Sequence, residues 1–372
     1  MFLETARRFL ADEMPLREVR RLGVTRAGFE RDWWSRAVSI GWTGMLVPEA
    51  LGGAGQDVVA LAGLAQEAGR AIAPGPLWPA NLVIAALARS AGSPAGDPAT
   101  LDGLLAGKTI ATWAVCEPET YGWNPLASRV SARHAAGGYV IKGVKDRVEA
   151  ASEADLFLVT ADLNGRSAEF LLPRRTKGVS VTEAECIDIV RRYGVVAFDS
   201  AWVPADALVV GPDSAAGVIM WQSQLAALLL AAETLGAADR VFEFTLKWLF
   251  DRYSFGRPLA SYQAIKHRIA QRKVDLEAMR AIANAAVTAV SVQSADSARL
   301  VSSAKSYIGD TAVALAQDCV QLHGAIGVTW EHDLHLYLRR LTVNRALYGS
   351  PEEHRIILGD LANSAASGDS AK

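Results

Sequence analysis

Residues 252–258, Arg252-Tyr253-Ser254-Phe255-Gly256-Arg257-Pro258, join two of the longest helical patterns in the chain. Apolar residues recur at helical spacing before this stretch, over 215–253, and after it, over 262–291. Gly256 and Pro258 enforce a turn between the two patterns. The same spacing returns in two further long stretches, 295–323 and 331–347, and in a short one, 352–362. Four long amphipathic stretches favour a four-helix bundle, which we place at residues 214–372.

The period of the apolar residues changes to two in the middle of the chain, over residues 109–213. Short β-branched runs alternate there with turn signals, and Asn164-Gly165 is the strongest hairpin signal in the sequence. Long helical patterns do not separate these runs, so a parallel doubly wound sheet is not expected. The pattern predicts a small antiparallel β domain with strands near 110–115, 139–142, 156–160, 168–172, 179–182 and 195–199.

Residues 1–108 are predicted to form a helical domain, because apolar residues follow helical spacing over 29–40 and 58–72. The order is therefore α, then β, then α, which makes an α+β fold with boundaries near residues 108 and 213. The tail from Ser364 is small and polar, and we expect it to lack regular structure.

Composition narrows the class of protein. The 372 residues include 38 Lys and Arg against 40 Asp and Glu, and this net charge of −2 argues against a nucleic-acid-binding surface. Hydrophobic residues make up 51%, enough for a large folded core. No apolar run approaches the roughly 20 residues of a membrane span. The three scattered cysteines fit a reducing cytoplasm better than a disulfide framework or a zinc site.

Two motifs stand out against this background. In the first, Arg252 and Arg257 offer planar donors for phosphate, and Gln263 adds an amide near the start of the next helix. In the second, Gln321-Leu322-His323-Gly324-Ala325-Ile326-Gly327, two glycines open the backbone after a long helix. The Gln321 side chain and the main-chain amides of this segment can donate hydrogen bonds to a pyrophosphate or an adenine. Each motif also has a purely structural interpretation, as a helix–helix corner and as a Schellman-type helix end.

Signatures of other chemistries are missing from the sequence. It contains no nucleophile elbow, no P-loop and no dinucleotide-binding glycine motif after a strand. His332 and His335 lie three residues apart, but no third ligand follows at a suitable spacing, so we expect no metal site.

Together with the order of helices and strands, the two motifs resemble the acyl-CoA dehydrogenase family, and the resemblance covers nearly the whole chain. Further matches are Gly41-Trp42, Val47-Pro48-Glu49, Gly52-Gly53, Cys116-Glu117-Pro118, Val203-Pro204, Trp330-Glu331-His332-Asp333 and Leu336-Tyr337-Leu338-Arg339-Arg340. The combination is specific to that family.

The resemblance implies a concrete activity. Members hold FAD between the β domain and the C-terminal bundle, at a subunit interface, and desaturate an acyl-CoA thioester. A carboxylate base takes the α proton while flavin N5 takes the β hydride. Electrons then pass to an electron-transfer flavoprotein or a similar acceptor. In the family, the two motifs bind the ADP half of an FAD whose ring lies in the neighbouring subunit. That role transfers to Arg252, Phe255, Gln263, Gln321, Gly324 and Ala325.

The sequence departs from the family where the catalytic base is expected. The commonest base is a Glu just before a Gly-Thr or Gly-Ser step, but here Tyr348 precedes Gly349-Ser350. A phenol, with a reference pKa near 10, is a poor substitute for a carboxylate. The alternative position of the base falls at about Ala227, with no carboxylate beside it. Glu233, Glu352 and Glu353 are more plausible as structural or surface residues than as displaced bases, so we assign no catalytic residue.

The expected flavin-ring site departs as well. Family members follow a Thr-Glu-Pro string with small residues that line the flavin and the acyl group, where this chain has Glu119-Thr120-Tyr121-Gly122-Trp123. They also carry a Lys-x-Trp-Ile-Thr string whose Trp packs on the flavin, and here it is Lys145-Asp146-Arg147-Val148-Glu149. Charged Arg147 and Glu149 suit a flavin ring poorly.

These losses are similar to those of the non-catalytic subunit in α2β2 acyl-CoA dehydrogenases of steroid side-chain breakdown. Our leading hypothesis is therefore a subunit that supports acyl-CoA desaturation in a hetero-oligomer with a second dehydrogenase subunit. A second hypothesis is a self-sufficient homotetrameric flavoenzyme in which Glu233 or Glu352 is a relocated base. A third is a flavin-free scaffold subunit that keeps the fold and lends only an interface.

Overall fold

The computed structural model describes residues 2–90, 98–118 and 122–369. The chain forms two discontinuous compact units. We call Met1–Val19, Val58–Ala73 and Ala227–Lys372 the helical unit, and Arg20–Asp57 and Pro74–Ala226 the sheet unit. The segment boundaries near 108 and 213 stay predictions, because these units divide the chain differently.

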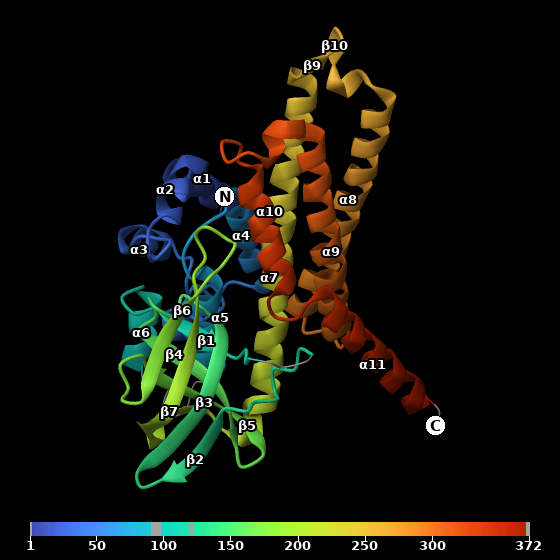
Figure 1. Cartoon of the computed structure of the whole chain (residues 1–372). Helices are drawn as coiled ribbons and strands as arrows, with labels where there is room; N and C mark the ends of the chain where they lie inside the picture. Colours follow the sequence, from blue (N-terminus) through green and yellow to red (C-terminus); the bar gives the residue numbers. More distant parts are fainter. Residues whose placement is uncertain (1, 91–97, 119–121, 370–372) are drawn as a thin grey trace. The chain divides into compact units, whose positions relative to one another are not determined.

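The helical unit contains the predicted bundle, in which α7, α8, α9 and α10 run side by side (Figure 1). The last helix, α11, continues to Asp369, so the expectation of an irregular tail from Ser364 is wrong as far as Asp369. The helices of this unit are α1 (Phe2–Glu13), α4 (Val58–Ala71), the later part of α7 (Pro212–Asp251), α8 (Gln263–Ser291), α9 (Ser297–His323), α10 (Leu334–Ala346) and α11 (Pro351–Asp369).

Helix α7 is the most apolar helix of the bundle. Length and composition would allow it to cross a membrane, but 67% of its most apolar window is buried, as in the core helix of a folded protein. Helix α4 crosses it closely, because glycines replace side chains at the crossing. A Cβ atom on Gly69 would collide with the main-chain oxygen of Glu233, and one on Gly236 with that of Gln66. The two backbones therefore touch.

A small hairpin joins α7 to α8 at the end of the bundle (Figure 1). Its strands are β9 (Tyr253–Ser254) and β10 (Arg257–Pro258), and Ser254 pairs with Arg257. Short 3-10 turns follow the hairpin at Leu259–Ser261 and follow α9 at Gly324–Val328. The turn predicted from Gly256 and Pro258 is thus confirmed.

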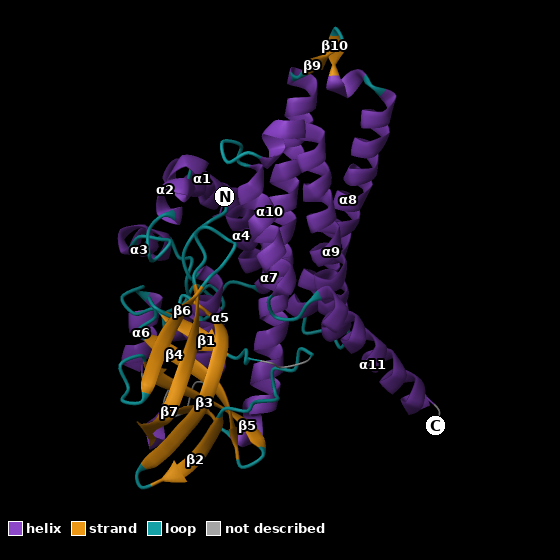
Figure 2. Cartoon of the chain, in the orientation of Figure 1, coloured by secondary structure: helices purple, strands orange, loops and turns teal. Residues whose placement is uncertain are grey.

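The sheet unit is built on eight strands in the order β6-β7-β3-β2-β4-β5-β8, with β1 paired to β4 (Figure 2). Most pairs are antiparallel, as predicted, but β1 and β2 each run parallel to β4, which the apolar pattern did not reveal. The strands are β1 (Ala111–Ala114), β2 (Ser131–Ala135), β3 (Gly138–Glu149), β4 (Leu156–Leu163), β5 (Arg166–Pro173), β6 (Val179–Ala184), β7 (Tyr193–Pro204) and β8 (Leu208–Val210).

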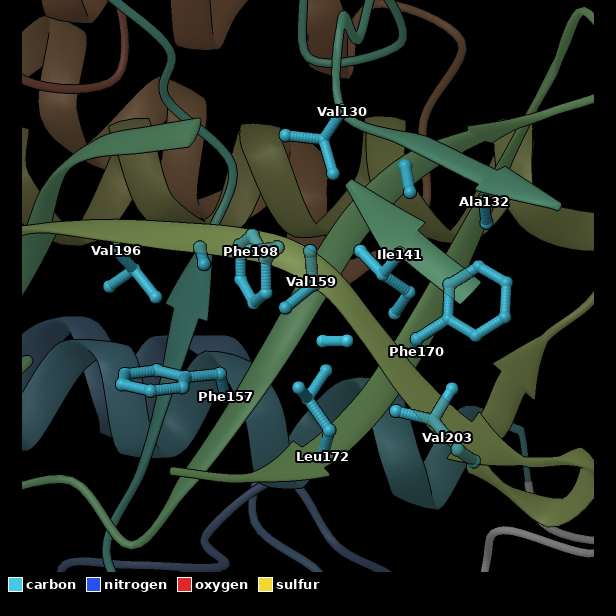
Figure 3. Close-up of a cluster of buried hydrophobic side chains, with 14 of the residues drawn as sticks. Val130, Ala132, Ile141, Phe157, Val159, Phe170, Leu172, Val196, Phe198 and Val203 are labelled. Carbon is cyan, nitrogen blue, oxygen red and sulfur yellow. The ribbon is translucent and has the colours of Figure 1, made fainter. Parts of the chain in front are cut away.

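Alternation of side chains along the strands builds the core of the sheet unit. Phe157 and Val159 of β4 and Phe170 and Leu172 of β5 point into one apolar cluster (Figure 3). The turn between these strands is the predicted hairpin, where Asn164 and Gly165 both have positive φ angles of 57° and 82°. The α-helical segments described in the sheet unit are the later part of α2 (Leu16–Gly23), α3 (Arg31–Ser39), α5 (Leu77–Arg89), α6 (Pro98–Leu105) and residues 212–226 of α7.

Candidate functional site

The hairpin at the end of the helical unit is rigidly built. The Tyr262 hydroxyl donates a hydrogen bond to the main-chain oxygen of Ser254 at 2.7 Å, and the Arg257 guanidinium lies 3.9 Å from the centre of the Tyr262 ring. Phe255, at the tip, has a positive φ of 50° and is 96% exposed. Phe250 and Tyr253, just before it in the chain, are 60% and 62% exposed, and such a group of exposed rings, unlike a single one, is typical of a contact surface.

A chain of ring contacts connects this hairpin to the second motif. The Arg252 guanidinium carbon lies 5.9 Å from the centre of the Trp248 ring. The other neighbour of Trp248 is His323, whose imidazole stacks on it at 5.2 Å between centroids with an interplanar angle of 18°. His323 belongs to the Gln321–Gly327 motif, so the fold brings the two motifs to the same end of the bundle.

The surroundings of His323 favour its neutral form. Its Nδ1 lies 2.7 Å from the main-chain oxygen of Cys319 and must donate, since a carbonyl only accepts. Burial lowers the pKa of His323, although the hydrogen bond to Cys319 opposes that shift. His332 packs edge-on against His323 at 4.6 Å. The cluster is therefore an aromatic support rather than a charged group.

All six residues predicted to bind a nucleotide are exposed on the chain. Arg252, Phe255 and Gln263 lie on or beside the hairpin, and Gln321, Gly324 and Ala325 lie where α9 ends. Gly324 has a positive φ of 68°, which favours glycine. The arrangement offers one guanidinium, two side-chain amides and main-chain amides, which together suit a phosphate or the edge of a base.

The turn that precedes α11 carries Tyr348 where a carboxylate base was expected. Tyr348 has a positive φ of 52° and Gly349 one of 93°, so the chain bends sharply here. The main-chain oxygen of Tyr348 lies 3.0 Å from Nε2 of buried His354. Tyr348 itself is 7% exposed. Buried contacts hold the turn in place, but the side chain at the expected position of the base is a phenol.

Lys305 supports the same turn from α9. Its buried ammonium donates to the main-chain oxygens of Asn344, Arg345 and Gly349 at 2.9, 3.0 and 2.8 Å. Burial lowers the pKa of Lys305 to about 7. Three acceptors match the three donors of an ammonium group, so Lys305 closes the C-terminal end of α10.

Both carboxylates that could be a relocated base, Glu233 and Glu352, are engaged in ion pairs. Both oxygens of Glu233, which is 1% exposed, accept hydrogen bonds, from Arg340 at 2.9 Å and from Asn344 at 2.8 Å. Glu352 lies at the surface and accepts from Arg345 at 2.6 Å. Their geometry is that of structural ion pairs.

The sheet unit contains a buried charge cluster at the expected flavin-ring motif. Lys145 is fully buried and donates to Glu117 at 2.6 Å and to Ser128 at 3.1 Å. Burial would raise the pKa of Glu117, but the Lys145 ammonium and these hydrogen bonds hold it below its usual value. The pair fixes the chain that follows β1, and therefore has a structural role.

Arg147 lies next to this cluster in a β-bulge. The register of β3 against β7 shifts between Lys145 and Val148, and Arg147 has a positive φ of 49°. Its guanidinium donates to the main-chain oxygen of Glu117 at 3.0 Å. Glu149, at the end of the motif, is buried beside Arg191 at 3.5 Å. Of the expected small-residue string, Glu119, Thr120 and Tyr121 lie outside the described residues.

Comparison with known proteins identifies the family. The family model of the acyl-CoA dehydrogenase N-terminal domain matches residues 1–108, and that of the acyl-CoA dehydrogenase C-terminal domain matches residues 216–362. The acyl-CoA dehydrogenase IpdE2 of Mycobacterium tuberculosis is 30% identical over 357 residues, which cover 95% of this chain and 93% of that protein. The chain belongs to the acyl-CoA dehydrogenase family.

Solved structures agree with this assignment. A variant of the Tcur3481–Tcur3483 steroid ACAD superimposes with a TM-score of 0.88 at 27% identity, covering 98% of each chain. The ChsE4–ChsE5 complex of Mycobacterium tuberculosis superimposes with a TM-score of 0.85 at 25% identity, covering 97% of this chain and 96% of the other. Members of the acyl-CoA dehydrogenase family are oxidoreductases that act on CH–CH bonds.

Two supporting residues of this family member were not found from the sequence. In the sequence, Trp248 is one apolar residue among many in a long helical pattern. It lies four residues before Arg252, however, and this spacing places both on one helix face. Nothing in the sequence marks Lys305 as a buried supporting residue, because a lysine within an amphipathic helix normally lies at the surface.

Proposed function

We propose that this chain is a non-catalytic subunit of a hetero-oligomeric acyl-CoA dehydrogenase. It supplies Arg252, Phe255, Gln263, Gln321, Gly324 and Ala325 to the nucleotide half of an FAD whose ring is held by a second dehydrogenase subunit. That partner brings the base. FAD, when bound, supplies the hydride acceptor for α,β-desaturation of an acyl-CoA.

The observation that carries this proposal is the exposure of Phe255 on a rigid hairpin. A ring that is 96% exposed and held by the contacts of Tyr262 needs a covering surface. The neighbouring Arg252 can meet a pyrophosphate in the same interface. These residues fit the nucleotide half of FAD, and the stack of Trp248 on His323 keeps them together.

The other half of the cofactor does not fit this chain. At the ring motif, Arg147 donates to the main-chain oxygen of Glu117, and buried Glu149 is paired with Arg191. Arg147 and Glu149 stand where the family's string has its Trp and Thr, whereas Lys145 and Glu117 match the Lys and Glu of the family strings. The phenol at Tyr348 and the engaged carboxylate of Glu233 support a base that comes from the partner subunit.

The relatives support a class of substrate and a kind of partner. A steroid ACAD and the ChsE4–ChsE5 complex are among the structures that superimpose on this chain over nearly its full length. We therefore propose a bulky acyl-CoA, such as a steroid side-chain thioester, as substrate of an α2β2 assembly. We place the assembly in the cytoplasm, where the three free cysteines stay reduced, with an electron-transfer flavoprotein or similar acceptor.

Co-expression with a dehydrogenase encoded by a neighbouring gene tests the proposal. The purified complex should be yellow, contain half as many flavins as chains, and desaturate an acyl-CoA. The Arg252→Ala variant should lose flavin from the complex without losing the partner. Arg299→Ala, on an exposed part of α9, serves as the matched control and should keep its flavin.

The two rival functions give different results. A self-sufficient enzyme would carry one flavin per chain when purified alone and would reduce a dye with an acyl-CoA. A flavin-free scaffold would leave the partner's flavin content unchanged in Arg252→Ala. Either result would overturn the proposal.

A further inference from the structure

The helical unit contains a second feature that the nucleotide half-site does not use. A half-open cavity of about 410 Å³ lies between α1, α4, α7 and α10. This volume falls within the range of small-molecule sites in proteins. All of its lining residues belong to the helical unit, and none belongs to the hairpin or to the end of α9.

The two sides of the cavity differ in character. Leu10, Met14 and Leu16, from α1 and the chain that follows it, form an apolar side. Arg70 of α4 and Arg240 of α7 line the cavity with Tyr337 of α10. Such a surface suits a molecule with an apolar body and an anionic end.

The arginines share the carboxylates around them. Arg7 is held by Glu67 at 2.6 Å, and Arg70 is held by Asp239 at 3.1 Å and by Glu243 at 2.6 Å. Arg240 reaches the same Glu243 at 3.3 Å, so one carboxylate serves two guanidinium groups. Three arginines and three carboxylates therefore form one network, in which Arg240 shares Glu243 with Arg70.

Tyr337 lies against these arginines without carrying a negative charge. Its hydroxyl donates to the main-chain oxygen of Arg70 at 2.8 Å. Burial raises the pKa of Tyr337 to about 12, with Arg240 lowering it in part, so the phenol stays neutral. The guanidinium of Arg240, whose side chain is 45% exposed, contacts this hydroxyl and Glu243, and its other N–H donors can meet an anion from solution.

We propose that this cavity binds an amphipathic organic carboxylate, with its anionic end at Arg240 and its apolar body on Leu10 and Met14. A guanidinium fork matches a carboxylate in geometry and charge. The site is separate from the proposed nucleotide half-site. The proposal that it binds a carboxylate therefore does not depend on the proposed function.

Calorimetric titration of the full chain with decanoate, below its micelle concentration, tests the site. We expect saturable binding of one decanoate per chain and much weaker binding of the uncharged analogue decanol. Arg240→Gln should weaken the affinity by about tenfold, the loss expected for one charge-assisted contact. Ala11→Phe, which adds a ring to an exposed lining position, should abolish binding.

Two control variants keep the test specific. Arg8→Gln removes an exposed charge from the same helix α1 outside the cavity and should leave the affinity unchanged. A separate apolar groove between α7 and α8, lined by Phe250 and Ile265 with Lys273, is the competing site. Absence of saturable binding, equal binding of decanol, or loss of binding in Lys273→Gln rather than in Arg240→Gln would overturn the proposal.

Discussion

The indole of Trp248 and the imidazole of His323 stack at 5.2 Å, and this contact joins two motifs that lie about 70 residues apart in the sequence. Because Arg252 follows Trp248 by one helical turn, the stack also determines where its guanidinium lies. A pair of uncharged rings thus positions the groups that we propose meet a partner's cofactor.

Replacing Trp248 with Ala should reduce the flavin content of the complex, because Arg252 and the end of α9 lose their common support. Trp248→Phe keeps a ring in the same place and should retain most of the flavin. Absorbance of the released flavin, relative to protein, measures both. If the two variants lost flavin equally, the stacking would have no positioning role.

Gly236→Ala should destabilise the helical unit by about 1–3 kcal/mol, since the added methyl group would collide with the main-chain oxygen of Gln66 on α4. Gly217 lies in the same helix, and a Cβ atom added there would meet no described atom within 4 Å. Gly217→Ala should therefore be neutral or stabilise by up to about 1 kcal/mol. Denaturant unfolding of both variants measures the difference, and similar effects would contradict the close crossing.

Glu233→Gln should lower stability by about 3 kcal/mol, because Arg340 would stay buried without its counter-charge. Turnover by the folded complex, counted per flavin, should not change. Thermal unfolding and a dye-reduction assay separate the two effects. A fall in turnover by orders of magnitude in a folded complex would instead identify Glu233 as the base.

Glu169→Gln should make the chain more stable at pH 8 and have little effect at pH 4. Burial raises the pKa of Glu169 to about 7, and among the described residues its Oε2 has no hydrogen-bond partner. The folded chain therefore binds a proton between about pH 4.5 and 7 that the unfolded chain has released, and its stability falls as the pH rises through this window.

The expected gain from Glu169→Gln at pH 8 is up to about 3 kcal/mol, from a shift of roughly two and a half pKa units. The unfolding temperature at several pH values measures it. Glu183→Gln, at an exposed strand position, is the control and should not show this pH-dependent gain. A gain that was the same at pH 4 and pH 8 would show that Glu169 does not titrate.

Much of the fold could be predicted because it follows from local periodicity. The helical spacing over 262–291 and 295–323 matches α8 and α9 closely, and Asn164-Gly165 forms the predicted hairpin turn. The parallel pairing of β1 and β2 with β4 could not be predicted, because the sequence of a short apolar strand does not show in which direction the neighbouring strand runs.

The candidate site, like the fold, could be predicted from the sequence only in part. The sequence by itself determined which residue types are present: an arginine and an amide motif for a nucleotide, a tyrosine in place of a base, and charges in place of the flavin-ring contacts. Each of these statements concerns only which amino acid occupies a given position. Only the tertiary structure decided that Trp248 and His323 bring the two motifs together, that Glu233 is neutralised by Arg340, and that Arg147 is tied to Glu117. The reason is physical, because such contacts join residues far apart along the chain and exist only once packing has fixed their distances and removed water.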